Sequence, residues 1–357
     1  MKMKQNKVLL VAYGRPFGGA EIYMGRLAQL LKEDASFYAL CDNDQVTAYL
    51  SGCGVHVFSY APVLKWKGSW KLEYSLVCAL VLPYLRLRYR IDTIWIQGFR
   101  EAILLPWARL LGYSAIVTMH VTLERSISQL LYPYLILCAQ KVICVSQSVE
   151  QSIPAFVQRG KVAVVQNWVS SVPKCPRQGC GGLPLRLLYV GRLVKYKGCA
   201  LILEAMRELK SRGKSHCVSL TIVGDGEHRS DLERQADGLN VHFAGFLRDP
   251  ASAYENADLF INPTLGPEGS PLVSLEAMSY GLPCILSDLA VNREISGDGE
   301  FALLFRGGDA TDLCAKIETC INSSSLLTKY GRLALKCVAS RHSRKMVRAR
   351  YIEEIGL

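Results

Sequence analysis

Two glutamates and two cations in the second half of the chain are of the residue types that could hold a sugar joined to a diphosphate. Glu268 lies in a Pro/Gly loop, and Glu276 follows it within an apolar helical pattern. Arg192 and Lys197 come after the apolar run from Leu185 to Gly191. Carboxylates accept hydrogen bonds from sugar and ribose hydroxyls, whereas guanidinium and ammonium groups pair with phosphate oxygens. By residue type alone, all four could equally be solvated surface charges.

The residues around the two glutamates predict a strand, a loop, a helix and a second strand. Leu259 to Asn262 is typical of a buried strand, and the helix expected from Leu272 to Tyr280 ends at Gly281-Leu282-Pro283. We expect Ser270 to cap this helix, with Pro271 in the first turn, where a missing N–H costs least. The free N–H groups at such a helix start favour an anion such as a diphosphate.

Two further glycine loops follow apolar runs in the same way. Val8 to Tyr13 leads into the loop Gly14 to Gly19 and then into a helical pattern from Ala20 to Lys32. Val218 to Val223 ends at Gly224-Asp225-Gly226-Glu227. A strand, a glycine loop and a helix open a doubly wound domain, where ligands meet the carboxyl ends of the strands. Glycines in such loops let a ligand approach the backbone N–H groups closely.

His120 lies at the carboxyl end of another predicted strand, Ala115 to Met119. In a doubly wound fold this position is close to bound ligands, although a histidine that only caps a turn is the alternative. Asp42-Asn43-Asp44 superficially resembles a metal-binding Asp-x-Asp, but it follows the predicted strand Phe37 to Leu40 and is interpreted as a solvated turn. We therefore predict no metal site.

Together these motifs resemble glycosyltransferase family 4, whose members are retaining enzymes of the GT-B fold. The family's donor-site pattern is a glutamate, seven residues, a second glutamate with alanine, and then Gly-x-Pro. Glu268, Glu276-Ala277 and Gly281-Leu282-Pro283 match this pattern. Gly191-Arg192 and Lys197-Gly198 match the family's Gly-Arg…Lys-Gly motif.

The resemblance implies an α/β chain of the GT-B fold, with two Rossmann-like doubly wound domains facing a cleft. It also implies retaining transfer of a sugar, with no metal and no cofactor besides the nucleoside-diphosphate-sugar co-substrate. Arg192 and Lys197 would stabilise the departing diphosphate, Glu268 would hold sugar hydroxyls, and His120 would lie beside the reacting carbon. Glu276 would bind the ribose. The residues that we assign to donor binding are Gly18, Gly19, Gly191, Gly224, Phe246, Gly269, Ser270, Pro271, Leu272 and Glu276.

The domain organisation follows from the same motifs. Residues 1–169 would form an acceptor-binding domain and residues 185–340 a donor-binding domain, joined by a Pro/Gly/Ser/Cys-rich linker at 170–184. Residues 341–357 resemble the closing helix that returns to the first domain. Within this scheme Trp168 departs from the family, because it replaces the glycine of the usual Asn-Gly-Val.

Composition indicates the class of partner. The chain of 357 residues has a net charge of +11, with 18 Lys and Arg against 10 Asp and Glu in residues 1–165. Such a balance favours an acidic partner, either a phosphorylated substrate or an anionic membrane surface. No nucleic-acid-binding motif is present, so we expect no nucleic-acid partner. The 13 cysteines are scattered, many of them in apolar runs, which is typical of reduced thiols in a cytoplasmic protein.

The stretch 63–90 has two interpretations. Its apolar run, Tyr74 to Leu85, is shorter than the ~20 residues that span a bilayer. Trp66 and Trp70 with lysines precede it and arginines follow, which suits contact with a membrane interface. A core helix packed on a sheet is the alternative. The expected location is therefore cytoplasmic, with peripheral attachment to the inner face of the cell membrane as the further hypothesis.

The sequence thus predicts a glycosyltransferase that moves a hexose-type sugar onto a glycan or lipid-linked acceptor, in cell-envelope polysaccharide biosynthesis such as that of capsule or lipopolysaccharide. Two rival hypotheses stay open at this point. One is a sugar-nucleotide epimerase of the GT-B fold, which would need no acceptor. The other is a non-catalytic relative that binds a nucleotide or a membrane.

Overall fold

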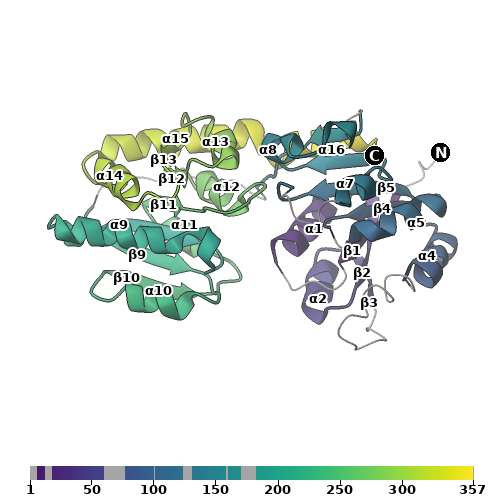
Figure 1. Cartoon of the computed structure of the whole chain (residues 1–357), viewed down its shortest axis with the longest axis horizontal. Coiled ribbons are helices and arrows are strands. Elements are labelled where there is room, and N and C mark those ends of the chain that lie inside the picture. Colours follow the sequence, from purple (N-terminus) through teal and green to yellow (C-terminus); the bar gives the residue numbers. More distant parts are fainter. Residues whose placement is uncertain are drawn as a thin grey trace. The chain divides into compact units, whose positions relative to one another are not determined.

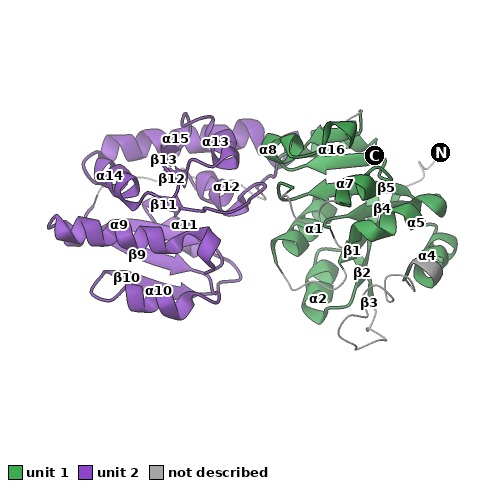
Figure 2. Ribbon diagram, viewed as in Figure 1, with its two compact units in different colours: residues 1–166, 347–357 green, residues 167–346 purple. Residues whose placement is uncertain are grey.

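A computed structural model describes residues 6–12, 18–59, 77–99, 101–123, 131–157, 160–169 and 182–356. The chain divides into two compact units, residues 1–166 with 347–357 and residues 167–346 (Figure 2). The expectations for Trp66 and Trp70, for the first residues of the loop Gly14 to Gly19, and for most of the 170–184 linker lie outside the described residues.

Unit 1 is built on a parallel sheet, which in the described residues has seven strands in the order β3-β2-β1-β4-β5-β6-β7. β1 pairs on one side with β2 and on the other with β4, so the chain reverses direction along the sheet after β3. The strands are β1 (Asn6–Ala12), β2 (Ala35–Cys41), β3 (His56–Ser59), β4 (Thr93–Ile96), β5 (Ser114–Met119), β6 (Lys141–Cys144) and β7 (Val162–Val164).

Helices cover both faces of this sheet, and the core lies between them and the strands (Figure 1). Crossover connections between parallel strands are right-handed. The sheet grows from β1 to β3 in one direction and from β4 to β7 in the opposite direction, so the helices that follow β3 lie on one face and α1 and α2 on the other. The helical elements are α1 (Gly19–Leu30), α2 (Asp44–Gly52), η1 (Val77–Val81), α4 (Leu82–Tyr89), η2 (Glu101–Leu104), α5 (Leu105–Leu110), α7 (Tyr132–Ile136), α8 (Gln147–Gln151) and η3 (Ala155–Val157).

Unit 2 repeats the plan with a parallel sheet of six strands among the described residues, in the order β10-β9-β8-β11-β12-β13. β8 pairs with β9 and β11, so the reversal in strand order falls beside β8. The strands are β8 (Leu185–Val190), β9 (Val218–Val223), β10 (Val241–Gly245), β11 (Leu259–Asn262), β12 (Cys284–Ser287) and β13 (Leu303–Phe305). In doubly wound sheets ligands bind at the carboxyl ends of strands next to such a reversal.

The helical elements of unit 2 connect these strands and then extend beyond them. They are η4 (Lys195–Lys197), α9 (Cys199–Ser211), η5 (Ser215–Cys217), α10 (Arg229–Gln235), α11 (Ala251–Asn256), α12 (Leu272–Ser279), α13 (Ala290–Ser296), α14 (Ala310–Ile321) and α15 (Ser324–Arg341). α9 is strongly amphipathic and buries Leu201, Ile202 and Leu209 against the sheet. Within the described residues no helix is long and apolar enough to cross a membrane.

The last helix, α16 (Arg344–Ile355), brings the end of the chain to unit 1. Arg348 forms a bidentate pair with Asp34, and Lys141 lies 2.7 Å from Glu354. Where the chain first passes from unit 1 to unit 2, Asn167 to Val169 already belong to unit 2, and the Val169 N–H donates to the carbonyl of His342. The units therefore divide after residue 166, a few residues before the 169/170 boundary expected from the sequence.

Candidate functional site

The carboxyl ends of β8, β9 and β10 are joined by backbone hydrogen bonds. The Gly191 N–H donates to the Val223 carbonyl at 3.0 Å, and the Gly224 N–H donates to the Gly245 carbonyl at 2.8 Å. Gly224 has φ +137°, and a Cβ there would lie 1.9 Å from the Gly191 carbonyl oxygen. Only glycine fits this close approach of two backbones. Gly191 and Gly224, both predicted from the sequence, thus hold two loops in one fixed arrangement.

The loop after β11 is fixed to the loop after β8 in the same manner. The Tyr196 carbonyl accepts the Leu265 N–H at 2.7 Å. Gly198 is the N-cap residue of α9 with φ +70°, and a Cβ at that position would meet the Pro263 carbonyl oxygen at 2.1 Å. Gly266 packs against the ring of Tyr196, where a Cβ would have no room. Backbone contacts therefore bring the predicted cations and the predicted glutamate loop to one place in unit 2.

Lys197 and Glu268 form an ion pair across these two loops. The Glu268 side chain is 8% exposed, and its second oxygen, Oε2, has no hydrogen-bond partner among the described residues. A buried carboxylate oxygen without a donor carries a desolvation cost that a ligand hydroxyl would remove. The structure thus leaves an acceptor beside the ammonium group, as a bound sugar requires.

Burial lowers the pKa of Lys197 to about 8, and the positive charge of Arg192 acts in the same direction. The Glu268 carboxylate favours the ammonium form and opposes both effects. At pH 7 the side chain is therefore still protonated, although its charge is poorly solvated. A phosphate group entering the site would supply the solvation that water does not.

Arg192 is exposed, and its guanidinium donates to the Tyr196 hydroxyl. Both side chains line a pocket of about 770 Å³, which has room for a nucleotide-sized ligand. Both cations lie near the Tyr196 ring, with Arg192 Cζ 5.9 Å and Lys197 Nζ 5.7 Å from its centroid. The remaining lining residues are Val194, Lys195, Gly226, Glu227 and Leu265.

The prediction that Ser270 caps the donor-side helix is wrong. α12 begins at Leu272 as expected, but its N-cap residue is Pro271 and no side-chain hydrogen bond is made at the cap. The Ser270 carbonyl instead accepts from Asn167 Nδ2 at 3.1 Å, which holds the loop in another position. The N–H groups at the start of α12, beginning with Leu272, are therefore not capped by Ser270, and a helix start of this kind favours an anion.

Glu276 lies one turn into α12 and accepts a hydrogen bond from the hydroxyl of Tyr254 at 3.2 Å. Tyr254 is buried in α11 and stacks on Tyr280, with ring centroids 5.3 Å apart. This support fixes the carboxylate, and sequence reasoning missed it because the two residues belong to different helices. Phe246 follows β10 directly and is 69% exposed, while Gly269 is buried in the loop before α12.

Unit 1 contains a second group of polar side chains at strand ends. His120 follows β5, and its Nε2 donates to Oε1 of Gln97, 2.8 Å away at the end of β4. Gln97 is buried, and its Nε2 has no partner among the described residues. The His120 ring meets the ring of Tyr23 edge-on at 4.5 Å, and the Tyr23 hydroxyl pairs with that of Tyr351 from α16. Gln97 was missed, although the strand-end rule that found His120 applies to it as well.

The glycines predicted in unit 1 lie at the start of α1. Gly18 is the N-cap residue, and among the described residues no atom lies within 4 Å of a Cβ built at Gly19. Asn43 of the Asp-Asn-Asp tripeptide caps α2 by accepting from Gln45 N at 2.9 Å, which is a structural role.

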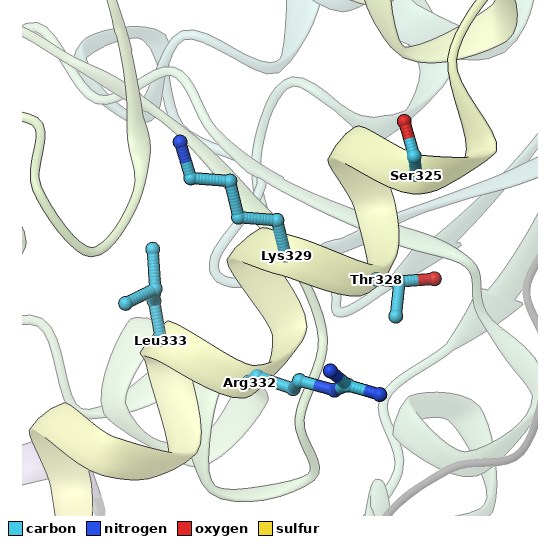
Figure 3. Close-up of a pocket in the computed structure, with 5 residues that line it drawn as sticks. All are labelled: Ser325, Thr328, Lys329, Arg332 and Leu333. Carbon is cyan, nitrogen blue, oxygen red and sulfur yellow. The ribbon is translucent and has the colours of Figure 1, made fainter.

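A further pocket of about 540 Å³ lies along α15, and one face of that helix lines it (Figure 3). Its side chains are Ser325, Thr328, Lys329, Arg332 and Leu333. None of the predicted site residues belongs to this group. The strand ends of unit 2 combine a pocket, a buried ion pair and an open acceptor, so we place the candidate site there.

The fold and the sequence comparisons define the class of this protein. Two doubly wound parallel units match solved GT-B structures, which confirms the predicted fold class. The family model Glycosyltransferase Family 4 matches residues 17–171, and Glycosyl transferases group 1 matches residues 184–323. Over most of both units the chain is therefore similar to the glycosyltransferases that these two models describe.

Relatives with described roles include several cell-envelope enzymes. The chain is 30% identical over 165 residues to the capsular polysaccharide biosynthesis glycosyltransferase CapM of Staphylococcus aureus, covering 44% of this chain and 42% of that one. It is 32% identical over 171 residues to the phosphatidyl-myo-inositol mannosyltransferase of Mycobacterium leprae, covering 45% and 44%. The matches thus span less than half of these two relatives. With the O-antigen biosynthesis glycosyltransferase WbnH of Escherichia coli the identity is 26%, over 79% of this chain and 81% of that one.

Among solved structures, HepE of Anabaena in complex with UDP and glucose superposes with a TM-score of 0.81 at 18% identity, over 99% of this chain and 100% of that one. The sucrose-phosphate synthase of Thermosynechococcus elongatus gives 0.80 at 17% identity, over 99% and 98%. At such identities the likeness concerns the fold.

Proposed function

We propose that this protein transfers a sugar from a nucleoside diphosphate to a glycan or lipid-linked acceptor of the cell envelope. The observation that carries the proposal is the buried Lys197–Glu268 pair, which leaves one carboxylate oxygen open beside an ammonium group. A nucleoside-diphosphate sugar presents phosphate and hydroxyl groups next to each other. It therefore offers a partner to each member of the pair at the same time.

The residue roles follow from this placement. Lys197 and Arg192 bind the diphosphate and stabilise its charge as it leaves, together with the N–H groups at the start of α12. Glu268 accepts hydrogen bonds from sugar hydroxyls through Oε2. Glu276, fixed by Tyr254, accepts from the ribose hydroxyls. These roles use positioning and charge rather than a covalent intermediate on the protein.

We further propose that the reaction retains configuration and needs no metal. The leaving diphosphate is neutralised by two side-chain cations and a helix start, which do the work that a divalent ion does elsewhere. The incoming acceptor would attack on the same face as the leaving group, with a phosphate oxygen taking its proton. No cofactor besides the sugar nucleotide enters this scheme.

His120 would act on the sugar in the same reaction, and Gln97 is its positioning residue. By accepting from Nε2, Gln97 fixes the ring orientation and its tautomer. Replacing Gln97 with Leu should lower kcat more than it changes KM, because the binding groups stay in place while the imidazole loses its orientation. Gln97→Glu, which keeps an acceptor, should restore part of kcat.

The acceptor class is inferred from the relatives, whose names refer to capsule, O-antigen and lipopolysaccharide core. A lipid-linked acceptor would bring the enzyme to an anionic membrane surface, for which the net charge of +11 provides attraction. We propose a cytoplasmic location with peripheral attachment.

The test is a thermal-shift series with UDP, GDP, ADP and their sugar conjugates, followed by turnover assays on lipid-linked acceptors. A ligand that binds only the folded state raises the unfolding midpoint, so one base should stand out. UDP is the first choice because HepE was solved with it. No shift with any nucleotide would refute the donor site. Conversion of the donor without any acceptor would instead indicate an epimerase.

A further inference from the structure

Large hydrophobic side chains are exposed on one helical layer of unit 1. Among the described residues of this unit, the exposed large hydrophobic side chains belong to η1, α4, η2, α5, α7 and η3 or directly flank α7. None of them belongs to α1 or α2, which lie on the other face of the sheet. We call this surface the apolar face. Its members are Leu80, Tyr84, Leu87, Ile103, Trp107, Leu110, Leu131, Tyr134, Leu137 and Phe156.

The spacing of these residues places them on the outer side of each helix. Along η1 and α4, Leu80, Tyr84 and Leu87 recur at intervals of four and three residues, and Ile103, Trp107 and Leu110 do the same along η2 and α5. Residues at such intervals share one face of a helix. The opposite faces already supply the core, so the outward hydrophobic residues add nothing to the packing of the sheet.

The helices form one continuous surface rather than separate spots. α4 rests on the turn that follows α5, because the Tyr113 hydroxyl donates to the Leu82 carbonyl at 2.7 Å and Arg86 lies 5.0 Å from the Tyr113 ring. α5 in turn contacts α7. Tyr134 of α7 stacks on Phe156 of η3, with ring centroids 5.5 Å apart. Figure 1 shows α4 and α5 close together in unit 1.

The charges on this surface have one sign. Arg88 and Arg90 are exposed at the end of α4, and Arg109 is exposed on α5 beside Trp107. The ranges 77–90, 101–111 and 131–140 contain a single acidic residue, Glu101, and it is fully buried. Leu87 and Leu110, with 81% and 77% exposure, lie next to these arginines in the sequence. The apolar face is therefore both hydrophobic and basic.

We propose that the apolar face docks unit 1 onto an anionic lipid bilayer. Leucine and aromatic side chains would enter the acyl boundary, with Tyr84, Trp107 and Tyr134 at the depth that amphipathic rings prefer, while the arginines meet lipid phosphates. A protein partner would need acidic groups matched to each arginine, whereas an anionic leaflet offers charge everywhere. A second copy of this chain would bring arginines against arginines. Charge complementarity thus favours the bilayer.

The experiment is flotation of the full chain with vesicles of phosphatidylcholine alone and of phosphatidylcholine with phosphatidylglycerol. One variant combines Leu87→Glu with Leu110→Glu, and a second replaces Arg88 and Arg109 with Gln. Met346→Glu, an exposed hydrophobic of unit 2, is the matched control. Each lost arginine should reduce the partition coefficient on anionic vesicles roughly fivefold, and added salt should reduce it further.

We expect wild-type protein and Met346→Glu to float with anionic vesicles and to remain largely free with neutral ones. Both variants of the apolar face should lose binding to the anionic vesicles. The proposal would be overturned if both variants of the apolar face floated as well as the wild type, or if the wild type did not float with anionic vesicles. A wild-type dimer in solution that the Leu87/Leu110 variant abolishes, without any vesicle binding, would assign the face to a second copy instead. The thermal shift with UDP checks that each variant is folded, and it separates failure of docking from failure of the donor site.

Discussion

Lys197 offers the sharpest test of the donor site, through the pH dependence of nucleotide affinity. The ammonium form pairs with a diphosphate, and burial lowers the pKa of this group to about 8. The charge is therefore present at pH 7 and is lost as the pH rises through 8. The ligand prefers the protonated enzyme, so affinity for UDP should be level below that pKa and fall by up to about tenfold for each pH unit above it.

Three substitutions give the magnitude and the controls. Lys197→Met removes a charged hydrogen bond worth about 1.5–3 kcal/mol, so UDP should bind roughly 10- to 150-fold more weakly at pH 7. The UDP affinity of this variant should not change as the pH rises through 8. Lys197→Arg keeps the charge at every accessible pH and should stay tight where the wild type weakens. Lys195→Met, two residues away at an exposed position, should show the same fall in UDP affinity above pH 8 as the wild type.

Isothermal titration of UDP over a pH series measures all four proteins in the same way. Melting without ligand accompanies each titration, because Lys197→Met leaves the Glu268 carboxylate buried without its partner. A wild-type affinity that stays level well above pH 8 would refute the reasoning. So would a Lys197→Met protein that still loses affinity over the same interval, since another group would then be responsible.

Three further substitutions test the surrounding structure. Gly224→Ala should lower stability by about 2–3 kcal/mol, seen as a lower melting midpoint, because a Cβ there would lie 1.9 Å from the Gly191 carbonyl oxygen. Tyr254→Phe should weaken UDP binding by about 1 kcal/mol in calorimetry through the loss of its hydrogen bond to Glu276; unchanged affinity would contradict the ribose role. Glu268→Gln should lower turnover about 100-fold in a transfer assay without weakening UDP binding, since Glu268 acts on the sugar; a selective loss of UDP affinity would point to the nucleotide instead.

The sequence predicted the strands of unit 2 closely because each is a short apolar run closed by Gly, Pro or a polar residue. Leu259–Asn262 and Val218–Val223 were predicted with the bounds that the structure has. Their carboxyl ends then located Arg192, Lys197 and Glu268 near one another, since neighbouring parallel strands end at the same edge of a sheet. The fold class followed from the same pattern.

The contacts that complete the site could not be predicted from local sequence patterns. Tyr254 supports Glu276 from another helix, and nothing in its own neighbourhood indicates this. Ser270 has the residue type of a helix cap, but the contact of Asn167 with its carbonyl belongs to a different arrangement of the loop. Both depend on residues distant in the sequence, and tertiary contacts of that kind override local capping preferences. α15 was likewise missed, although Ser323 caps it in the ordinary way.

The ion pair also bears on which ligand the site favours. Removing one partner of a buried pair is costly, by about 3–5 kcal/mol, because the remaining charge is left uncompensated. Under the proposed function, a nucleoside diphosphate alone would draw Lys197 toward phosphate and leave Glu268 without a donor. A sugar nucleotide would replace both partners at once, because its phosphate would meet the ammonium while its hydroxyls met the carboxylate. We therefore propose that this ion pair selects the complete donor over its nucleotide product, which would favour release of the product after transfer.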